Sequence, residues 1–108
     1  MAKQDYTEKQ IRTARYAKAL SNPARIAIME FLAKQETCFF GEIHEILPIA
    51  KATASQHLKE LKEAGLIQGE IIDPKVKYCI NKENWKEAKT LFSSIFDNCT
   101  CKKGGCCK

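Results

Sequence analysis

Cysteine is the residue type in this chain with the most distinctive chemistry, and four of the six cysteines lie in the last ten positions. They are Cys99, Cys101, Cys106 and Cys107. A C-x-C pair places two sulfurs on a short arc, and Gly104 and Gly105 let the chain fold back to bring in the others. Three thiolates suit trivalent arsenic or antimony, two or three suit copper(I), and four suit zinc or cadmium. We therefore expect these cysteines to bind a thiophilic metal or metalloid ion.

The same four thiols allow other chemistry. Lys102, Lys103 and Lys108 favour thiolate over thiol through their positive charge. Under oxidation the C-x-C and C-C pairs can close disulfides, which would make the segment a redox switch. A flexible tail with fortuitous thiols is the third reading. We expect the two remaining cysteines, Cys38 and Cys79, to be small buried or half-buried hydrophobic residues.

A second set of polar residues lies on one predicted helix within Ile49 to Ile67. Ala54, Leu58 and Leu61 recur at helical spacing and share one face. The opposite face carries hydrogen-bond donors, namely Lys51, Thr53, Gln56, Lys59 and Lys62. Gly65 ends the helix, and Pro48 separates it from the short amphipathic segment FGEIHEIL. This pattern is typical of a helix-turn-helix, with an ordinary helical hairpin as the alternative.

Other segments supply the elements that hold this motif. Thr7 to Gln10 has the form of a capping box and opens a helix that runs toward Leu20. Asn22 and Pro23 begin a second helix that is apolar on more than one face, which places it at the centre of the domain. Residues 66–73 and 76–81 alternate as a β-hairpin. A hairpin behind a helix-turn-helix is a wing, whose Lys75 and Lys77 are either phosphate contacts or merely solvated.

The last predicted helix runs from its cap at Asn81 to about Asp97 and carries a wide apolar stripe. One small domain does not need two terminal helices this apolar for its own core. A second subunit would bury the exposed stripes, so the sequence predicts a homodimer. The interface residues we expect are Ile11, Trp85, Leu91, Phe92 and Ile95.

Composition limits the class of protein. The chain of 108 residues is 44% hydrophobic and 29% charged, with a formal net charge of +5. We expect one domain over 1–97 and a flexible cysteine-rich tail over 98–108. No apolar run reaches the roughly 18 residues of a membrane span, and the polar N-terminus indicates a cytoplasmic protein without a signal peptide. An enzyme is not predicted, because there is no acid and base pair near a nucleophile, no phosphate loop and no C-x-x-C pair. No cofactor is expected for folding.

Three segments together resemble the ArsR family of winged-helix repressors, which respond to metals and metalloids. They are ALSNPARIAIMEFL, SQHLKELKEAGLI and VKYCI, and the likeness covers about Ala17 to Asn81. The resemblance implies a mainly α fold with a small β-hairpin and a homodimer joined through the terminal helices. It also implies that the second helix of the helix-turn-helix enters the major groove of a palindromic operator. Inducer binding would then release the DNA.

The resemblance also places the groove-facing positions, which fall between Lys51 and His57. Glutamine can make a bidentate contact to adenine, lysine can reach guanine, and serine and threonine bond to bases or phosphates. His57 is either a phosphate contact or a half-buried histidine whose hydrogen bonds are satisfied. The predicted DNA-binding residues are Lys51, Thr53, Ser55, Gln56, His57, Lys59, Lys75 and Lys77.

The inducer sites common in that family are absent from this sequence. The C-x-C of the usual arsenic and cadmium site is replaced by Cys38-Phe39-Phe40, and the last helix has no histidine for a zinc or nickel site. Some members sense arsenite through C-terminal cysteines, and the tail of this chain is similar to theirs. We therefore expect As(III) or Sb(III) as the inducer. The alternatives are an organic trivalent arsenical, copper(I), cadmium or a redox signal. A more distant alternative is a metal-buffering protein that uses the winged helix only as a scaffold. Lys51, Thr53 and Gln56 argue against it, because a buffer needs no polar recognition face.

Overall fold

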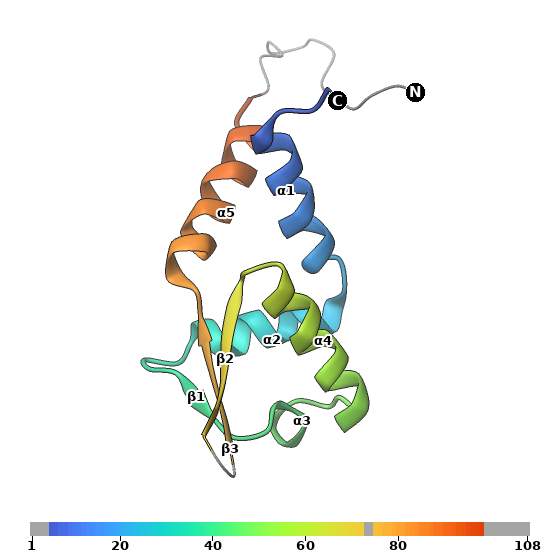
Figure 1. Cartoon of the computed structure of the whole chain (residues 1–108), viewed down its shortest axis with the longest axis vertical. Helices are drawn as coiled ribbons and strands as arrows, with labels where there is room; N and C mark the ends of the chain where they lie inside the picture. Colours follow the sequence, from blue (N-terminus) through green and yellow to red (C-terminus); the bar gives the residue numbers. More distant parts are fainter. Residues whose placement is uncertain (1–4, 73–74, 99–108) are drawn as a thin grey trace, which may run out of the picture.

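Helices dominate the chain, with three short strands between them in the described residues (Figure 1). The computed structural model describes residues 5–72 and 75–98. The elements, in order, are α1 (Glu8–Ala19), α2 (Pro23–Ala33), β1 (Phe39–Phe40), α3 (Ile43–Ile46), α4 (Lys51–Glu63), β2 (Ile67–Ile72), β3 (Lys75–Ile80) and α5 (Lys82–Phe96).

The helix starts follow from local side-chain chemistry. Thr7 and Gln10 form a reciprocal capping box, in which each side chain accepts a hydrogen bond from the other residue's backbone N–H, at 2.9 and 3.1 Å. The side chain of Asn22 accepts from the backbone N–H of Ala24 at 2.8 Å, and Asn81 caps α5 in the same way. All three predicted caps are confirmed, because each depends only on residues within one turn of the helix.

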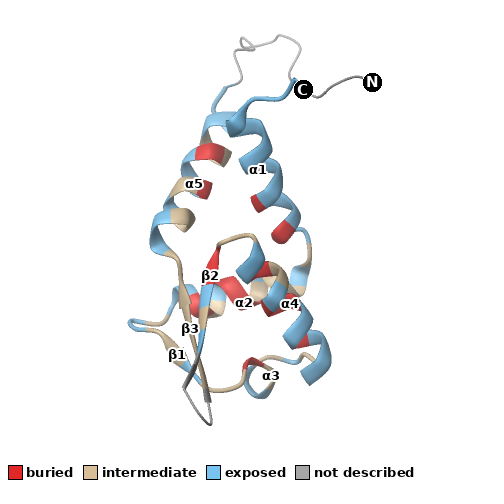
Figure 2. Ribbon diagram, in the orientation of Figure 1, coloured by how far each residue is buried: buried red, intermediate tan, exposed pale blue. Residues whose placement is uncertain are grey.

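The core forms around α2. Ile28 and Met29 of this helix are almost fully buried, together with Leu61 of α4 and Leu66 beside it (Figure 2). The prediction that α2 lies at the centre is therefore confirmed for most of its apolar residues. Ile26 differs from them, because it remains 39% exposed. Burial of so many large aliphatic side chains on one helix supplies much of the apolar surface removed from water on folding.

Three strands form one antiparallel sheet with the order β1-β3-β2. The predicted hairpin is confirmed as β2 and β3, whose register pairs Ile67 with Ile80 at its base. We call this hairpin the wing. The strand β1 was not predicted; it pairs Phe39 with Tyr78 along the other edge of β3. A strand of two residues gives no alternating pattern, so only its distant partner defines it.

The helix-turn-helix consists of α3, which is a single turn, and α4. Gly65 ends α4 with a φ of +87°, as predicted, since this left-handed conformation favours glycine. The prediction of a mainly helical winged helix-turn-helix with a small β-hairpin is confirmed, with one strand added. The helices α1 and α5 lie together at the opposite end of the molecule from α3 (Figure 1). We call α1 and α5 the helical pair.

The expectation for Cys38 and Cys79 is wrong. Their sulfur atoms form a disulfide that joins the residue before β1 to the strand β3. The two residues are half-buried, as expected, but neither acts as an isolated hydrophobic side chain. The cause is the pairing of β1 with β3, which places the two residues opposite each other.

Among the described residues, none of the helices has the length and apolar character needed to cross a membrane.

Candidate nucleic-acid interface

The helix α4 has one buried and one exposed face. Ala54, Leu58 and Leu61 point into the core, with exposed fractions of 3%, 8% and 0%. The opposite side of the helix is exposed and carries only polar residues or alanine (Figure 2). We define the polar face of α4 as Lys51, Thr53, Ser55, Gln56 and Lys59. The structure thus brings five of the eight predicted DNA-binding residues onto one surface.

The polar face is held only loosely by the protein itself. The side-chain amide of Gln56 donates a hydrogen bond to the Glu60 carboxylate at 3.3 Å, and both groups lie at the surface. An exposed pair one helical turn apart contributes a few tenths of a kcal/mol, about 0.2–0.5. Gln56 can therefore leave this contact for another partner at small cost.

His57 lies on the other side of α4 from these residues. It is 8% exposed, and its Nδ1 accepts a hydrogen bond from the guanidinium Nε of Arg25 at 3.1 Å. The same guanidinium donates to the carbonyls of Lys18 and Ala19, both at 3.3 Å. His57 is thus the satisfied histidine of the two alternatives, and we remove it from the DNA-binding set. Arg25 joins α1, α2 and α4, a role that the sequence did not indicate because its partners are far apart in the chain.

The wing places its two lysines differently. Lys75 pairs with Ile72 at the outer end of the hairpin, and its side chain is outside the described part of the structure. Lys77 lies further along β3 and is half-buried, with its Nζ 5.9 Å from the centroid of the Phe40 ring. An ammonium at this distance gains a modest cation–π attraction, about 0.5–1 kcal/mol at an exposed site. The Lys77 ammonium therefore lies near Phe40 of β1, although the residue itself belongs to the wing strand β3.

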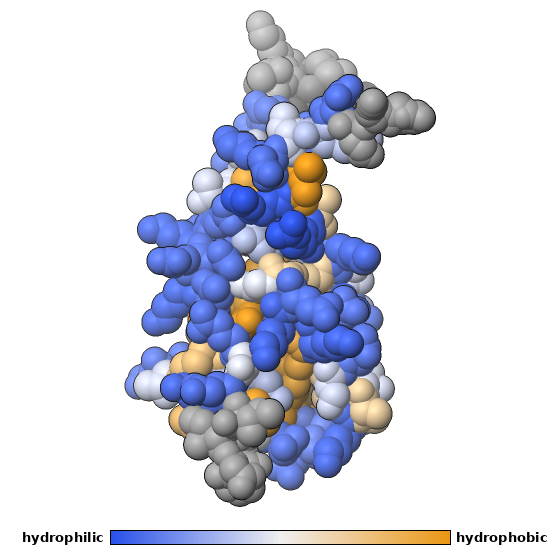
Figure 3. All heavy atoms as spheres, viewed as in Figure 1, coloured by the Kyte–Doolittle hydropathy of each residue, from blue (hydrophilic) through white to orange (hydrophobic). Residues whose placement is uncertain are grey.

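A groove lies between α4 and the sheet. Its α4 side includes Ser55, Lys59 and Lys62, and Gly69 and Tyr78 line its other side. Hydrophilic atoms cover the surface of the molecule over α4 in Figure 3. Two ammonium groups beside hydroxyl donors suit the phosphates of a nucleic acid, which take their contacts from such groups.

The helical pair is joined by one carboxylate. Glu87 of α5 accepts a hydrogen bond from the Tyr16 hydroxyl at 2.6 Å and pairs with the Arg12 guanidinium at 2.8 Å. The hydrogen bonds from Tyr16 and Arg12 hold the pKa of Glu87 below its usual value. Burial and the hydrogen bond to Glu87 raise the pKa of Tyr16 to about 12. This cluster fixes α1 against α5 at physiological pH.

The predicted interface residues fall into three classes of exposure. Ile11 and Ile95 are 46% and 57% exposed, whereas Trp85 and Phe92 are half-buried against the core. Leu91 is 8% exposed and belongs to the protomer's own core. The expectation that Leu91 faces a partner therefore needs correction, because its side of α5 packs inward beside Ala88.

Two further apolar residues are exposed at the same end of the molecule. Tyr6 is 66% exposed and Phe96 is 74% exposed. Phe96 belongs to the apolar stripe of α5 and stacks with Phe92, with ring centroids 6.4 Å apart. This stripe was the signal that could have added Phe96 to the expected interface residues. Tyr6 precedes the cap of α1, where no periodicity applies.

The tail cysteines Cys99, Cys101, Cys106 and Cys107, and with them most of the predicted tail, lie outside the described residues. Within residues 5–72 and 75–98, no group of three or more histidine, cysteine, aspartate or glutamate side chains is placed to hold a metal ion.

The fold and the polar face define the class of winged helix-turn-helix domains, and comparison with known proteins agrees. A family model described as a helix-turn-helix domain matches residues 20–70. The chain is 46% identical over 63 residues to the uncharacterized HTH-type transcriptional regulator YceK of Bacillus subtilis, covering 56% of this chain and 60% of that protein. It is 39% identical over 61 residues to the HTH-type transcriptional repressor SmtB of Mycobacterium tuberculosis, covering 56% of this chain and 44% of SmtB.

Solved structures extend the likeness over most of the chain. An ArsR-like transcriptional regulator from Rhodococcus sp. RHA1 matches with a TM-score of 0.67 at 17% identity, covering 84% of this chain and 85% of that one. A second match is the homodimeric winged helix-turn-helix DNA-binding domain of Mb0332 from Mycobacterium bovis, a possible ArsR-family regulator. Its TM-score is 0.61 at 23% identity, and the match covers 93% of this chain and 94% of that one. The solved structures thus share the winged helix-turn-helix fold with this chain, and the sequence matches to HTH-type transcriptional regulators span 56% of it. Its relatives are transcriptional regulators, a class without enzymatic activity.

Proposed function

We propose that this protein is a DNA-binding transcriptional repressor that acts in the cytoplasm as a homodimer. The observation that carries the proposal is the polar face of α4, which is exposed beside the wing while the other side of the same helix is fixed in the core. A helix mounted in this way can enter the major groove, whose width admits one α-helix.

In this proposal the side chains of α4 have two tasks. Gln56 and Lys51 contact base edges, because a side-chain amide matches adenine and an ammonium reaches guanine. Thr53 and Ser55 bond to bases or phosphates. Lys59, together with Lys75 and Lys77 of the wing, contacts phosphates and holds the domain on the duplex.

The homodimer forms through the helical pair. Ile11 and Ile95 are exposed enough to be covered by a second copy, and Trp85 and Phe92 of α5 are half-buried against the core. Two recognition helices related by a twofold axis read two half-sites, so the operator we expect is palindromic.

The inducer in this proposal is arsenite or antimonite, bound by three of the four tail cysteines. Binding can release DNA only if the ion prefers a dimer geometry that fits the operator poorly. The tail follows α5 directly, so a chelate formed by the tail can act on the helical pair. The sulfur ligands, and the similarity of the tail to the C-terminal cysteines of ArsR members that sense arsenite, support this choice of ion.

The DNA-binding proposal is tested by selecting a binding sequence from a random duplex library and measuring its affinity by fluorescence anisotropy. The Lys51→Ala/Gln56→Ala variant is expected to lose most of the preference for the selected sequence. Lys86→Ala is the control, because Lys86 is exposed on α5 away from the polar face. Failure to select any sequence, or an unchanged preference in the double variant, would contradict the proposal.

The inducer proposal is tested by titrating arsenite into the complex of DNA with fully reduced protein. The full chain is expected to release the DNA, whereas a variant with all four tail cysteines changed to serine is expected to stay bound. Parallel titrations with antimonite, copper(I), cadmium and phenylarsine oxide rank the ions. Release of the serine variant at the same arsenite concentration would place the ligands elsewhere in the chain.

A further inference from the structure

The backbone register alone brings Cys38 and Cys79 together. The strand β1 pairs Phe39 with Tyr78 and Phe40 with Lys77, in antiparallel order. One step back along β1 is Cys38, and one step forward along β3 is Cys79, so these two residues are the next cross-strand pair. Their Cα atoms are 4.5 Å apart, the separation of a pair that shares no backbone hydrogen bonds and whose side chains are closest.

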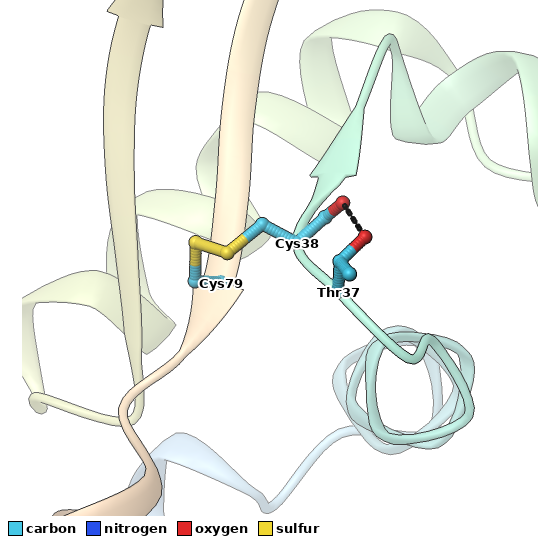
Figure 4. Close-up of a disulfide and its surroundings, with 3 residues drawn as sticks. All are labelled: Thr37, Cys38 and Cys79. Atoms are coloured by element: carbon cyan, nitrogen blue, oxygen red, sulfur yellow. Dashed lines mark hydrogen bonds between the residues drawn. A yellow bond between two sulfur atoms is a disulfide. The ribbon is translucent and has the colours of Figure 1, made fainter.

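The disulfide joins the chain just before β1 to the neighbouring strand β3 (Figure 4). Both cysteines are half-buried and line a cavity of about 240 Å³ that is also bordered by Glu36, Lys82 and Trp85. Neither cysteine belongs to the apolar core cluster. A small thiol or disulfide can therefore reach the sulfur atoms, and the core does not need the bond for its packing.

The proposed cytoplasmic location bears on whether this disulfide is permanent or regulatory. A protein that acts on DNA in the cytoplasm works where thiols are kept reduced, and disulfides there are usually transient and regulatory. This step depends on the proposed function. A cross-strand cysteine pair with an open approach then suits a bond that forms and breaks during regulation better than a permanent link.

We propose that Cys38 and Cys79 form a redox-active site, distinct from the tail cysteines, which a small-molecule disulfide closes and a thiol reductant opens. The thiolate of one cysteine attacks the small disulfide, forms a mixed disulfide and expels one thiol. The second protein thiolate then attacks the protein sulfur of the mixed disulfide and expels the other thiol. Two protein thiols are oxidised, one small disulfide is reduced to two thiols, and the two protons pass to the expelled thiolates.

The state of this site controls how firmly the helix-turn-helix is held against the wing. Without the disulfide, β1 is paired with β3 through two residues, Phe39 and Phe40. The chain passes from β1 through Gly41 and Glu42 into α3, and α3 packs on α4. The closed disulfide links the residue just before β1 covalently to β3 of the wing. The oxidised protein therefore holds both DNA-contacting elements in place before binding, which reduces the entropy lost on association.

The redox half of the proposal is tested on the full chain with the four tail cysteines changed to serine. After equilibration with excess oxidised glutathione, mass spectrometry with an alkylating reagent should find no free thiol, and after reduction it should find two. The unfolding temperature should rise on oxidation by an amount on the order of 10 °C, because the bond closes a long loop. Free thiols or stable glutathione adducts after oxidation would overturn it.

The regulatory half is tested with the same protein on its selected DNA. Oxidised protein should bind at least about threefold more tightly than reduced protein. The additional Cys38→Ser/Cys79→Ser change should give the affinity of the reduced form under both conditions. Equal affinity of the two redox states, or a response that persists without the pair, overturns the regulatory half. A protein that binds no DNA in either state contradicts the proposed function, while the thiol titration still decides the redox site.

Discussion

The two ends of this domain expose opposite kinds of surface from helices that are built alike. On α4 the exposed face carries lysines, hydroxyls and an amide. At the far end of the helical pair the exposed side chains include Ile11, Ile95 and Phe96. Both regions turn a second, apolar face into the same core. The buried faces therefore explain the fold, and the exposed faces distinguish what each region can bind.

This difference separates two kinds of partner. A polar face has no apolar area to remove from water. Its binding free energy comes from new hydrogen bonds and from the release of counterions, as on nucleic acid. Exposed aliphatic and aromatic side chains contribute favourable free energy when a partner removes them from water, as in a contact between two copies of a chain. Substitutions on the two faces should accordingly affect different measurements.

The largest effect should come from the buried side of α4. Leu61→Ala removes a fully buried side chain and should lower the free energy of unfolding by about 2–5 kcal/mol. Its neighbour Lys62 is exposed, and Lys62→Ala should change that free energy by less than about 0.5 kcal/mol. Urea unfolding followed by circular dichroism measures both. Similar losses for the two variants would mean that α4 does not have the two faces described.

Next in size is the effect of Gln56 on base choice. Gln56→Ala should cost about 1–3 kcal/mol at one base position and relax the preference there. Lys77→Ala should weaken all sequences about equally and lower the salt slope by about one. Lys75→Ala should behave as Lys77→Ala does. Binding assays on the selected site and its single-base variants, at several salt concentrations, separate the two patterns. An unchanged preference in Gln56→Ala would show that this helix is oriented differently on DNA.

A smaller effect is expected at the helical pair. Ile95→Asp should weaken self-association by at least about tenfold, since a charge would replace an apolar residue at the proposed contact between subunits. The helical content should not change, because Ile95 is 57% exposed in the protomer. Analytical ultracentrifugation over a concentration series gives the dissociation constant. Wild-type protein that sediments only as a monomer at micromolar concentration would remove the basis of the homodimer.

The smallest effect is the pH dependence from Glu87. Its pKa is lowered in the folded state, so its contribution to stability is present above the unfolded value near 4.5 and is lost as pH falls through the folded value. Wild type should exceed Glu87→Gln in stability at pH 7, and the difference should close in acid. The group is partly solvated, so added salt should reduce the effect. Glu30→Gln, on the exposed side of α2, is the matched control for the loss of one surface carboxylate.

Features set by neighbouring residues could be predicted from the sequence. The caps at Thr7, Asn22 and Asn81 and the stop at Gly65 are each determined within a few positions. The hydrophobic period of α4 likewise indicated its buried face. Local rules of this kind are reliable because the side chain and the backbone group it serves are adjacent in the chain.

Features set by residues far apart in the chain could not be predicted from the sequence. Arg25 and His57 are 32 positions apart, and nothing in either neighbourhood indicates that they meet. The strand β1 exists because β3 passes beside it, and the register of that pairing brings Cys38 to Cys79. The run Thr37-Cys38-Phe39-Phe40 is rich in residues that favour strands. This composition could have indicated β1, but not its pairing with β3. Leu91 was assigned to the wrong side of α5 because the apolar stripe is wide enough to serve two surfaces.

The disulfide also divides the chain topologically. It joins two residues 41 positions apart, so the oxidised molecule is a covalent ring with two open arms. The ring contains β1, α3, α4, β2 and all of β3 except Ile80, whereas α1 and α2 form one arm and α5 the other. A single backbone cut anywhere in the ring leaves both arms attached to each other through sulfur. The helix-turn-helix can thus be nicked while α1 and α5 stay in one covalent molecule, as long as the bond is closed.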